Sequence, residues 1–455
     1  MLRLLDVWIA VLATTVGVFG ASVYANLSYD VTDGADFASF PPFRPGYDGN
    51  YNDHLGAEYY EIAVAITKGR GYADPFRTES GPTAWMPPLL TLYTAGILHL
   101  NDGDKTATAN ALIVSQAVAL WLTGLLTLLI ARRTAPRVPS VVVAALMTIA
   151  LITRFHTAFQ VTHDSWLVML AVDALLFGML FGRVLSRPWR ALLWGMVGGL
   201  TALVSPIAGL CWGAYSLTTA IRERRVRPLL FACVAMVVVM SPWIVRNYLV
   251  FGRFIPVKSN LAYELYQSQL LNEEGRLSTK VFRTHPYSSG GAERAEYVAL
   301  GEQAFLERKR EQFLEAVRHD PKLFLLKIYD RLQAATIDYS PMDDEEYERE
   351  LLFRLCYLLQ PLTVFAAVSL VLASPVRRLP RGAWAGLTFL AVYLLPYVLV
   401  SYYDRYEFPI WGLKTLVLVW WLEMLFSGTR PDEHEIEGPA ATMRAKPRIP
   451  VGRPS

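Results

Sequence analysis

The sequence is poor in charge and in cysteine. Of its 455 residues only 18% are charged, whereas soluble proteins usually approach a quarter. Its three cysteines, Cys211, Cys233 and Cys356, all lie in apolar segments and have neither a disulfide framework nor the spacing of a metal knuckle. The net charge is only +3, and no cluster mixes basic and aromatic residues as a nucleic-acid-binding surface does. A disulfide-rich secreted domain and a basic nucleic-acid-binding protein are therefore excluded.

Apolar residues, by contrast, are abundant and lie in long blocks. They make up 53% of the chain, and the mean hydropathy is +0.29. Because about 20 apolar residues cross a bilayer as a helix, we predict an all-α polytopic membrane protein with about ten transmembrane helices. The predicted spans are 4–24, 107–130, 138–153, 166–181, 191–204, 207–220, 228–245, 351–373, 383–400 and 409–426.

Two stretches of the chain admit a second interpretation. The first is preceded by Arg3, and residues 21–25 offer a passable signal-peptide cleavage site. We favour a retained helix, because the run is long for a signal peptide and the topology needs this span. Pro206 interrupts another apolar run, which forms either two short helices or one kinked helix.

Positive charges in the short loops decide between these alternatives. Arginine-rich groups lie at 132–137, 183–190, 222–227 and 377–381, and a fifth basic group lies in the tail at 444–453. Positively charged loops stay in the cytoplasm, and splitting the run at Pro206 places all five groups on one side together with Arg3. Both termini are then cytoplasmic.

Two larger loops face outward in this topology. They span 26–106 and 247–350, so that residues 1–427 form a membrane-embedded domain and 428–455 a polar cytoplasmic tail that we expect to be disordered. Within the loops we predict a helix over 57–67, an interfacial helix over 87–100 and a charged amphipathic helix over 292–318. A second amphipathic stretch follows at 322–337.

Five stretches carry a family resemblance. They are NDHLGAEYYEIAVAITKGRGY (52–72), GPTAWMPPLLTLY (81–93), THDSWLVML (162–170), SPWIVRNYLVFGRFIPVKSN (241–260) and YYDRYEFPIWGLK (402–414). In this order they resemble GT-C glycosyltransferases of the family 39-like type, relatives of aminoarabinose transferases and protein mannosyltransferases. The resemblance covers most of the chain outside the tail.

The resemblance implies a GT-C-like fold in a bacterial inner membrane. It also implies an enzyme that moves a sugar from a polyprenyl-phosphate donor to an acceptor on the outer membrane face, with inversion and with a carboxylate as general base. The acceptor, whether a glycan, a lipid or a protein, is not indicated.

Three acidic residues are the catalytic candidates. Counted from the family pattern, the expected first-loop acid falls on Leu55, with Asp53 two residues before it and Glu58 three after it. We take Asp53 as the first candidate for the base and Glu58 as the second, while either is alternatively a solvated loop acid. Asp164 matches the acid that the family places at the start of a membrane helix, and it also suits an N-cap.

Two further hypotheses concern a bound metal ion and a buried acid. His163 could join Asp53, His54 or Asp164 on a divalent cation, but no metal-spaced motif supports this and no metal ligands are assigned. Asp173 lies within a predicted span, and intramembrane acids are functional candidates by default.

Basic residues at the outward ends of spans are the candidates for binding phosphate. Two guanidinium groups, from Arg246 and Arg405, would hold the leaving phosphate, with Lys258 assisting. The alternative is snorkelling or interfacial pairing with Asp404, Glu407 or lipid headgroups. The remaining predicted substrate-binding residues are Trp85, Asn247, Tyr248, Ser259, Asn260 and Tyr406.

Two further classes of function stay open. A transporter or flippase of a lipid-linked sugar would show inverted repeats and several mid-membrane charges, and the sequence offers no visible repeat and only Asp173. A non-catalytic envelope assembly protein would tolerate loss of both Asp53 and Asp164.

Overall fold

The computed structural model describes residues 2–28, 58–158, 164–272, 281, 284–288, 292–337 and 359–427. Across these ranges helices make up the regular secondary structure, and an isolated antiparallel bridge joins Ala73 and Pro82. The expected all-α membrane architecture is confirmed. The predicted tail 428–455 lies outside the described residues.

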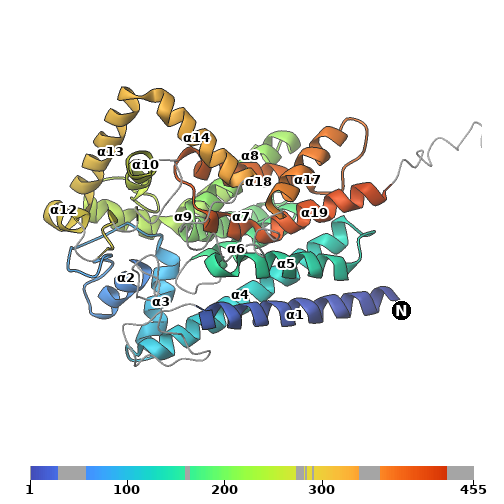
Figure 1. Ribbon diagram of the computed structural model, residues 1–455, viewed down its shortest axis with the longest axis horizontal. Helices are drawn as coiled ribbons and strands as arrows, with labels where there is room; N and C mark the ends of the chain where they lie inside the picture. The colour runs from blue at the N-terminus through green and yellow to red at the C-terminus, as the bar shows by residue number, and fades with distance from the viewer. Residues whose placement is uncertain are drawn as a thin grey trace, which may run out of the picture.

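Helices stand at all ten predicted apolar segments, and the long ones lie side by side along one direction (Figure 1). Four of the described helices, α1, α4, α9 and the run ending in α19, are long and apolar enough to cross a membrane, while α5, α6, α17 and α18 are shorter apolar helices. The number of crossings stays a prediction. The bundle helices are α1 (Leu2–Ser28), α4 (Lys105–Thr134), α5 (Ser140–Ala158), α6 (Ser165–Phe181), α7 (Pro188–Val204), α8 (Pro206–Glu223), α9 (Val226–Phe251), α17 (Leu359–Ala373), α18 (Ala383–Leu399) and α19 (Trp411–Phe426).

The chain breaks at Ser205, which confirms the division of the apolar run. Ser205 has an extended backbone, and Pro206 opens α8 at a position where a missing N–H costs no helical hydrogen bond. A side chain at Gly209 would collide with Ala202 of α7. The two short helices therefore pack closely against each other.

The arginine-rich loops gather at one end of the bundle, which we call the arginine end. Arg137 pairs with the buried Glu423 near the end of α19 at 2.8 Å, and Arg225 donates to the Leu185 carbonyl. Arg133 and Arg381, from two different loops, both lie over the ring of Phe181. Four of the five basic groups thus share one side, as the topology requires.

The first helix lies against one side of the bundle. Asp6 of α1 accepts hydrogen bonds from the backbone N–H groups of Ser140 and Val141, which are otherwise unsatisfied at the start of α5. Further along, Trp121 of α4 donates to Thr15. These contacts hold α1 against α4 and α5.

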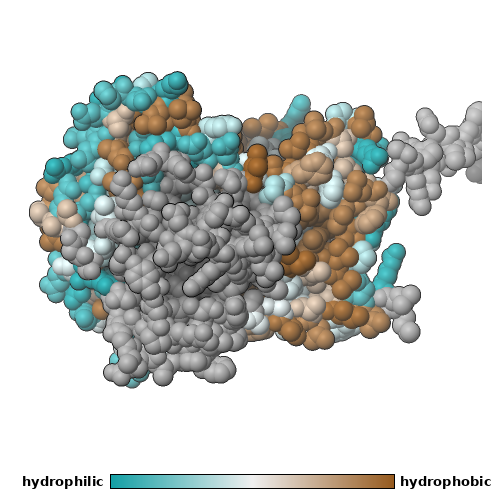
Figure 2. Space-filling model, in the orientation of Figure 1, coloured by the Kyte–Doolittle hydropathy of each residue, from teal (hydrophilic) through white to brown (hydrophobic). Residues whose placement is uncertain are grey.

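A second layer of shorter helices covers the opposite end of the bundle. We call this the cavity end, after the cavity described in the next section. Polar side chains gather over this layer, and apolar ones dominate the bundle surface toward the arginine end (Figure 2). α3 runs across the direction of the bundle (Figure 1), as expected of an interfacial helix. The layer comprises α2 (Glu58–Thr67), α3 (Pro88–Leu100), α10 (Leu261–Tyr266), the π-helix η1 (Gln267–Leu271), α12 (Ala292–Leu300), α13 (Glu302–His319) and α14 (Pro321–Thr336), and the 3-10 helix η2 (Asp404–Ile410) precedes α19.

The prediction of a single helix over 292–318 is wrong in one respect, because two helices cover these residues. Gly301 has a φ of 74°, which ends α12 and starts α13 in a new direction. After α13, Asp320 caps α14 by accepting from the Leu323 N–H. Aromatic residues fill the space between α10, α12, α13 and the loop before α3, including Phe76, Trp85, Tyr263, Tyr297 and Phe305.

Candidate functional site

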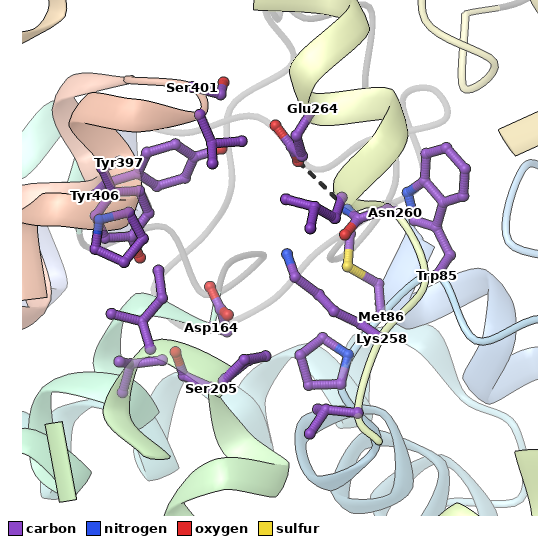
Figure 3. A pocket seen from close by; sticks show the side chains of 18 of the residues that line it. Trp85, Met86, Asp164, Ser205, Lys258, Asn260, Glu264, Tyr397, Ser401 and Tyr406 are labelled. Carbon is purple, nitrogen blue, oxygen red and sulfur yellow. Dashed lines mark hydrogen bonds between the residues drawn. The ribbon is translucent and has the colours of Figure 1, made fainter. Parts of the chain in front are cut away.

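A cavity of about 390 Å³ opens at the cavity end, where several helices begin or end. It is bounded by the first residues of α2, α6 and α8, by the last residues of α18 and by segment 256–261 (Figure 3). α6, α8 and α18 have their other ends at the arginine end. The polar or charged residues that line the cavity include Glu58, Tyr59, Asp164, Ser165, Ser205, Lys258, Asn260, Glu264, Gln267, His285, Tyr287, Tyr397, Ser401, Tyr403 and Tyr406.

Asp164 faces the cavity immediately before the first turn of α6 (Figure 3). Its side chain makes no capping hydrogen bond to the helix. Instead its Oδ2 accepts from the Tyr59 hydroxyl of α2 at 2.9 Å. The Asp164 side chain therefore does not act as an N-cap, although the N-terminus of α6 still favours its negative charge.

Glu58 also lies on the cavity wall, at the start of α2. Its Oε1 is 3.8 Å from Nε2 of His285. Both side chains are largely buried and line the cavity. Tyr287, another lining residue, accepts a hydrogen bond from Arg77 Nε at 3.0 Å. The structure thus brings Glu58 and Asp164 to one space, on adjacent elements.

Lys258 provides positive charge to this space. Among the described residues that line the cavity it is the one lysine or arginine, and its amino group points inward on the side facing Asp164 (Figure 3). A cation and carboxylates facing one partly enclosed volume can bind an anionic group and accept a proton beside it.

A buried carboxylate holds the Trp85 and Lys258 segments together. Glu302, 4% exposed at the first position of α13, accepts from Thr83 Oγ1, from the Ala84 N–H at 2.9 Å and from Ser259 Oγ at 2.8 Å. Tyr297 donates a fourth hydrogen bond at 2.9 Å. These donors with Glu302 form the Glu302 cluster, and they directly adjoin the lining residues Trp85, Lys258 and Asn260.

Arg246 lies outside the cavity lining. Its terminal nitrogens donate to the carbonyls of Tyr72 and Thr83, both at 2.7 Å, and its guanidinium lies over the rings of Tyr72, Trp243 and Phe251. The structure thus engages this arginine with the backbone of segment 72–83.

Other predicted substrate-binding residues are placed in different ways. Asn247 is fully buried and donates to the Ile255 carbonyl, whereas Tyr248 is 59% exposed on the outer surface of α9. Ser259 serves the Glu302 cluster. Tyr406 lines the cavity, stacked on Tyr397 with ring centroids 4.5 Å apart. Trp85 lines the cavity as well but packs mainly among aromatic rings.

Some predicted positions lie outside the described residues. They are Asp53, His54, His163 and the side chain of Arg405, whose backbone belongs to η2. In the described ranges no three His, Cys, Asp or Glu side chains form a group suited to a metal ion. The assignments to these positions remain predictions.

Asp173 is not part of the cavity. It is fully buried in α6 and accepts from Thr127 Oγ1 of α4 at 2.6 Å. A side chain at Gly412 of α19 would collide with both residues. The acid therefore lies at the point where three bundle helices meet.

Sequence reasoning missed several lining residues. Glu264 and Gln267 lie shortly after the 241–260 motif, and Ser401 lies directly before the 402–414 motif, but none of the three belongs to a family-like pattern. Tyr59 lies within such a pattern, and its distance of 105 positions from Asp164 hides the hydrogen bond between them. Only the meeting of α2 and α6 reveals it.

The chain is similar in fold to solved structures of one protein. No family model and no curated protein matches the chain. Among solved structures the chain is similar to ArnT from Cupriavidus metallidurans bound to undecaprenyl phosphate, with 15% identity, a TM-score of 0.37 and coverage of 91% of this chain and 77% of that one. The same protein in the apo state gives 16% identity, a TM-score of 0.34 and coverage of 92% and 77%.

Proposed function

We propose that this protein transfers a sugar from a polyprenyl-phosphate donor to an acceptor on the outer face of the membrane. The observation that carries the proposal is the cavity in which Lys258 faces Asp164 beside Glu58, at the end of the bundle away from the arginine-rich loops. The motifs of the sequence point the same way, and in the similar ArnT structure the bound molecule is undecaprenyl phosphate.

In the reaction that we propose, an acceptor hydroxyl or amine attacks the anomeric carbon of the sugar. The bond from this carbon to the phosphate oxygen breaks, and polyprenyl phosphate leaves with both electrons. Lys258 stabilises the charge on the departing phosphate. The proton of the acceptor passes to a carboxylate, for which Asp53 is the first candidate, while Asp164 and Glu58 position the reactants.

Electrostatics favours this arrangement over binding of an uncharged lipid. The ammonium group of Lys258 gains most when an anion replaces the water that surrounds it, because charges interact more strongly in a partly buried cavity. An attack from the side opposite the phosphate inverts the anomeric centre without a covalent enzyme intermediate. The cavity therefore needs a cation and a base on separate walls, which Lys258 and the acids provide.

Turnover in proteoliposomes tests the proposal. The donor would be undecaprenyl phosphate carrying glucose, mannose, arabinose or 4-amino-4-deoxyarabinose, with an envelope extract as acceptor and release of undecaprenyl phosphate as readout. We expect release from one of these donors by the wild type, and at least a hundredfold slower release by Lys258→Met, because one stabilising charge in a catalytic site contributes about 3 kcal/mol.

Lys322→Met is the matched control, because Lys322 is an exposed lysine on α14, away from the cavity. It should release the lipid at the wild-type rate. Equal rates for Lys258→Met and the wild type would contradict the role of Lys258, and no release from any donor by the wild type would contradict the transferase.

A further inference from the structure

One wall of the cavity carries polar groups that the proposed mechanism does not use. This wall is formed by Asn260 and by Glu264 and Gln267 of α10 and η1, and we call it the amide–acid wall. Figure 3 shows the Glu264 carboxylate and the Asn260 side chain on the side of the cavity away from Asp164, with the amino group of Lys258 between them and Asp164.

The hydrogen bonds within the wall fix its chemical polarity. Asn260 Nδ2 donates to Glu264 Oε1 at 3.3 Å, and Gln267 Nε2 donates to Glu264 Oε2 at 2.5 Å. An ionised carboxylate only accepts hydrogen bonds, so it holds each amide with its nitrogen toward Glu264. The carbonyl oxygen of Asn260 is therefore directed away from the acid.

That oxygen has no partner. Asn260 is only 2% exposed, and its Oδ1 is a buried acceptor without a hydrogen bond in the described part of the chain. A buried polar atom left unsatisfied costs about 1 to 3 kcal/mol, and native structures contain few of them. Because Asn260 also lines the cavity, a hydrogen-bond donor on a bound ligand would complete this acceptor.

The wall as a whole offers acceptors rather than donors. Asn260 Oδ1 is one acceptor, and the Glu264 carboxylate, with room for about four hydrogen bonds, is held by two amide donors. Hydroxyl and amino groups supply the donors that such a surface needs. A phosphate group, which is itself an acceptor, is better matched by Lys258.

We propose that Asn260 and Glu264 recognise the hydroxyl or amino groups of the sugar that is linked to the lipid phosphate. This inference rests on the proposed function, because it assumes that Lys258 holds that phosphate. Figure 3 shows the amino group of Lys258 on the side of Asn260 and Glu264 that faces Asp164, so a group attached to a phosphate at Lys258 would lie next to the amide–acid wall. The wall then distinguishes a glycosylated lipid phosphate from a bare one.

Native mass spectrometry of the protein in micelles measures this selectivity directly. The sample holds equal amounts of undecaprenyl phosphate and one glycosylated form, carrying glucose, mannose, arabinose or 4-amino-4-deoxyarabinose, and the bound species differ in mass. We expect the wild type to favour one glycosylated form at least tenfold. The variants Asn260→Leu and Glu264→Gln should each lower that ratio about five- to tenfold, the effect of losing one or two hydrogen bonds.

Two controls separate recognition of the sugar from loss of structure and from loss of phosphate binding. Glu79→Gln, which changes an acid that is 81% exposed, should leave the ratio unchanged. Lys258→Met should reduce the binding of both lipids and preserve the ratio.

The outcomes separate the two proposals. An unchanged ratio in both Asn260→Leu and Glu264→Gln, an equal loss of both lipids in these variants, or a wild type that favours no glycosylated form overturns the role of the wall. A wild type that binds neither lipid more strongly than Lys258→Met does overturns the phosphate site, and with it the proposed function.

Discussion

At the scale of single residues, the hydrogen-bond partners of a polar side chain show whether it maintains the structure or is available to a ligand. Arg246 donates to two backbone carbonyls, and Glu302 receives four hydrogen bonds. Both therefore maintain the shape of the cavity end. Lys258, Asp164 and Asn260 instead present polar atoms to the cavity. Charge type alone does not show this difference, but the direction of each side chain does.

The hydroxyl of Tyr59 gives the first prediction. It donates to Asp164 Oδ2 and fixes the orientation of the carboxylate. Tyr59→Phe should lower the turnover number about three- to tenfold with little change in the Michaelis constant for the donor, because one hydrogen bond contributes about 0.5–1.5 kcal/mol. The rate of undecaprenyl phosphate release in proteoliposomes measures it.

Tyr93→Phe is the matched control for this variant. Tyr93 lies on α3 outside the cavity lining, and the variant removes its hydroxyl, which is hydrogen-bonded to Ser115 of α4. Its turnover should equal that of the wild type. Equal losses in the two variants would show that Tyr59 does not act through Asp164.

At the scale of elements, the Glu302 cluster joins three segments that are distant in sequence. Glu302→Gln should loosen the contact of α13 with segments 83–85 and 258–260, at a cost of about 1 to 3 kcal/mol, because the buried donors lose a carboxylate partner. Faster hydrogen exchange over 83–85 and 292–319 measures it. Glu307→Gln, an exposed residue of the same helix paired with Arg253, should leave the exchange unchanged.

The same carboxylate has a defined pH dependence. Burial raises the pKa of Glu302 above its ordinary value of 4.5, so the folded layer retains this proton at a pH where the unfolded chain has lost it. The stability from this group is then complete below about pH 4.5 and declines as pH rises toward the folded pKa. The protection lost in Glu302→Gln should be largest at low pH, and a loss that grows with pH would contradict the assignment.

Local sequence patterns predicted where the helices lie better than they predicted which residues contact one another. Apolar runs and Pro206 were sufficient to place the bundle helices and the break at Ser205, because a span requires continuous apolar length and proline ends a helix. Gly301 was missed, since one glycine in a charged helical pattern gives only a weak signal. The roles of Glu302 and Tyr59 depend on partners far away in the sequence, which periodicity does not encode.

At the scale of the whole molecule, the two ends of the helix bundle differ in charge and in shape. Arginine-rich loops occupy one end, and the cavity with its polar layer occupies the other. By the rule that positive loops remain cytoplasmic, we expect the cavity to face outward. The proposed function requires this polarity, because its donor lipid and its acceptor would both reach the cavity from the outer face.

Cysteine labelling in intact cells tests the polarity. In a variant whose three native cysteines are replaced, Glu79→Cys at the cavity end should react with a membrane-impermeant maleimide, and Pro375→Cys at the arginine end should react only after permeabilisation. Both positions are exposed, so that reactivity reports the side of the membrane. The reverse pattern would place the cavity in the cytoplasm.

The central claim is that the chain consumes a polyprenyl-phosphate-linked sugar. Its most direct test is mass spectrometry of polyprenyl-phosphate sugars and envelope glycans from host cells that lack the chain, complemented with the wild type or with Asp164→Asn. The account predicts that one lipid-linked sugar accumulates, that one glycan loses a residue, and that the wild type restores both pools but Asp164→Asn does not. Unchanged pools in the cells lacking the chain would contradict the transferase and favour a non-catalytic envelope role.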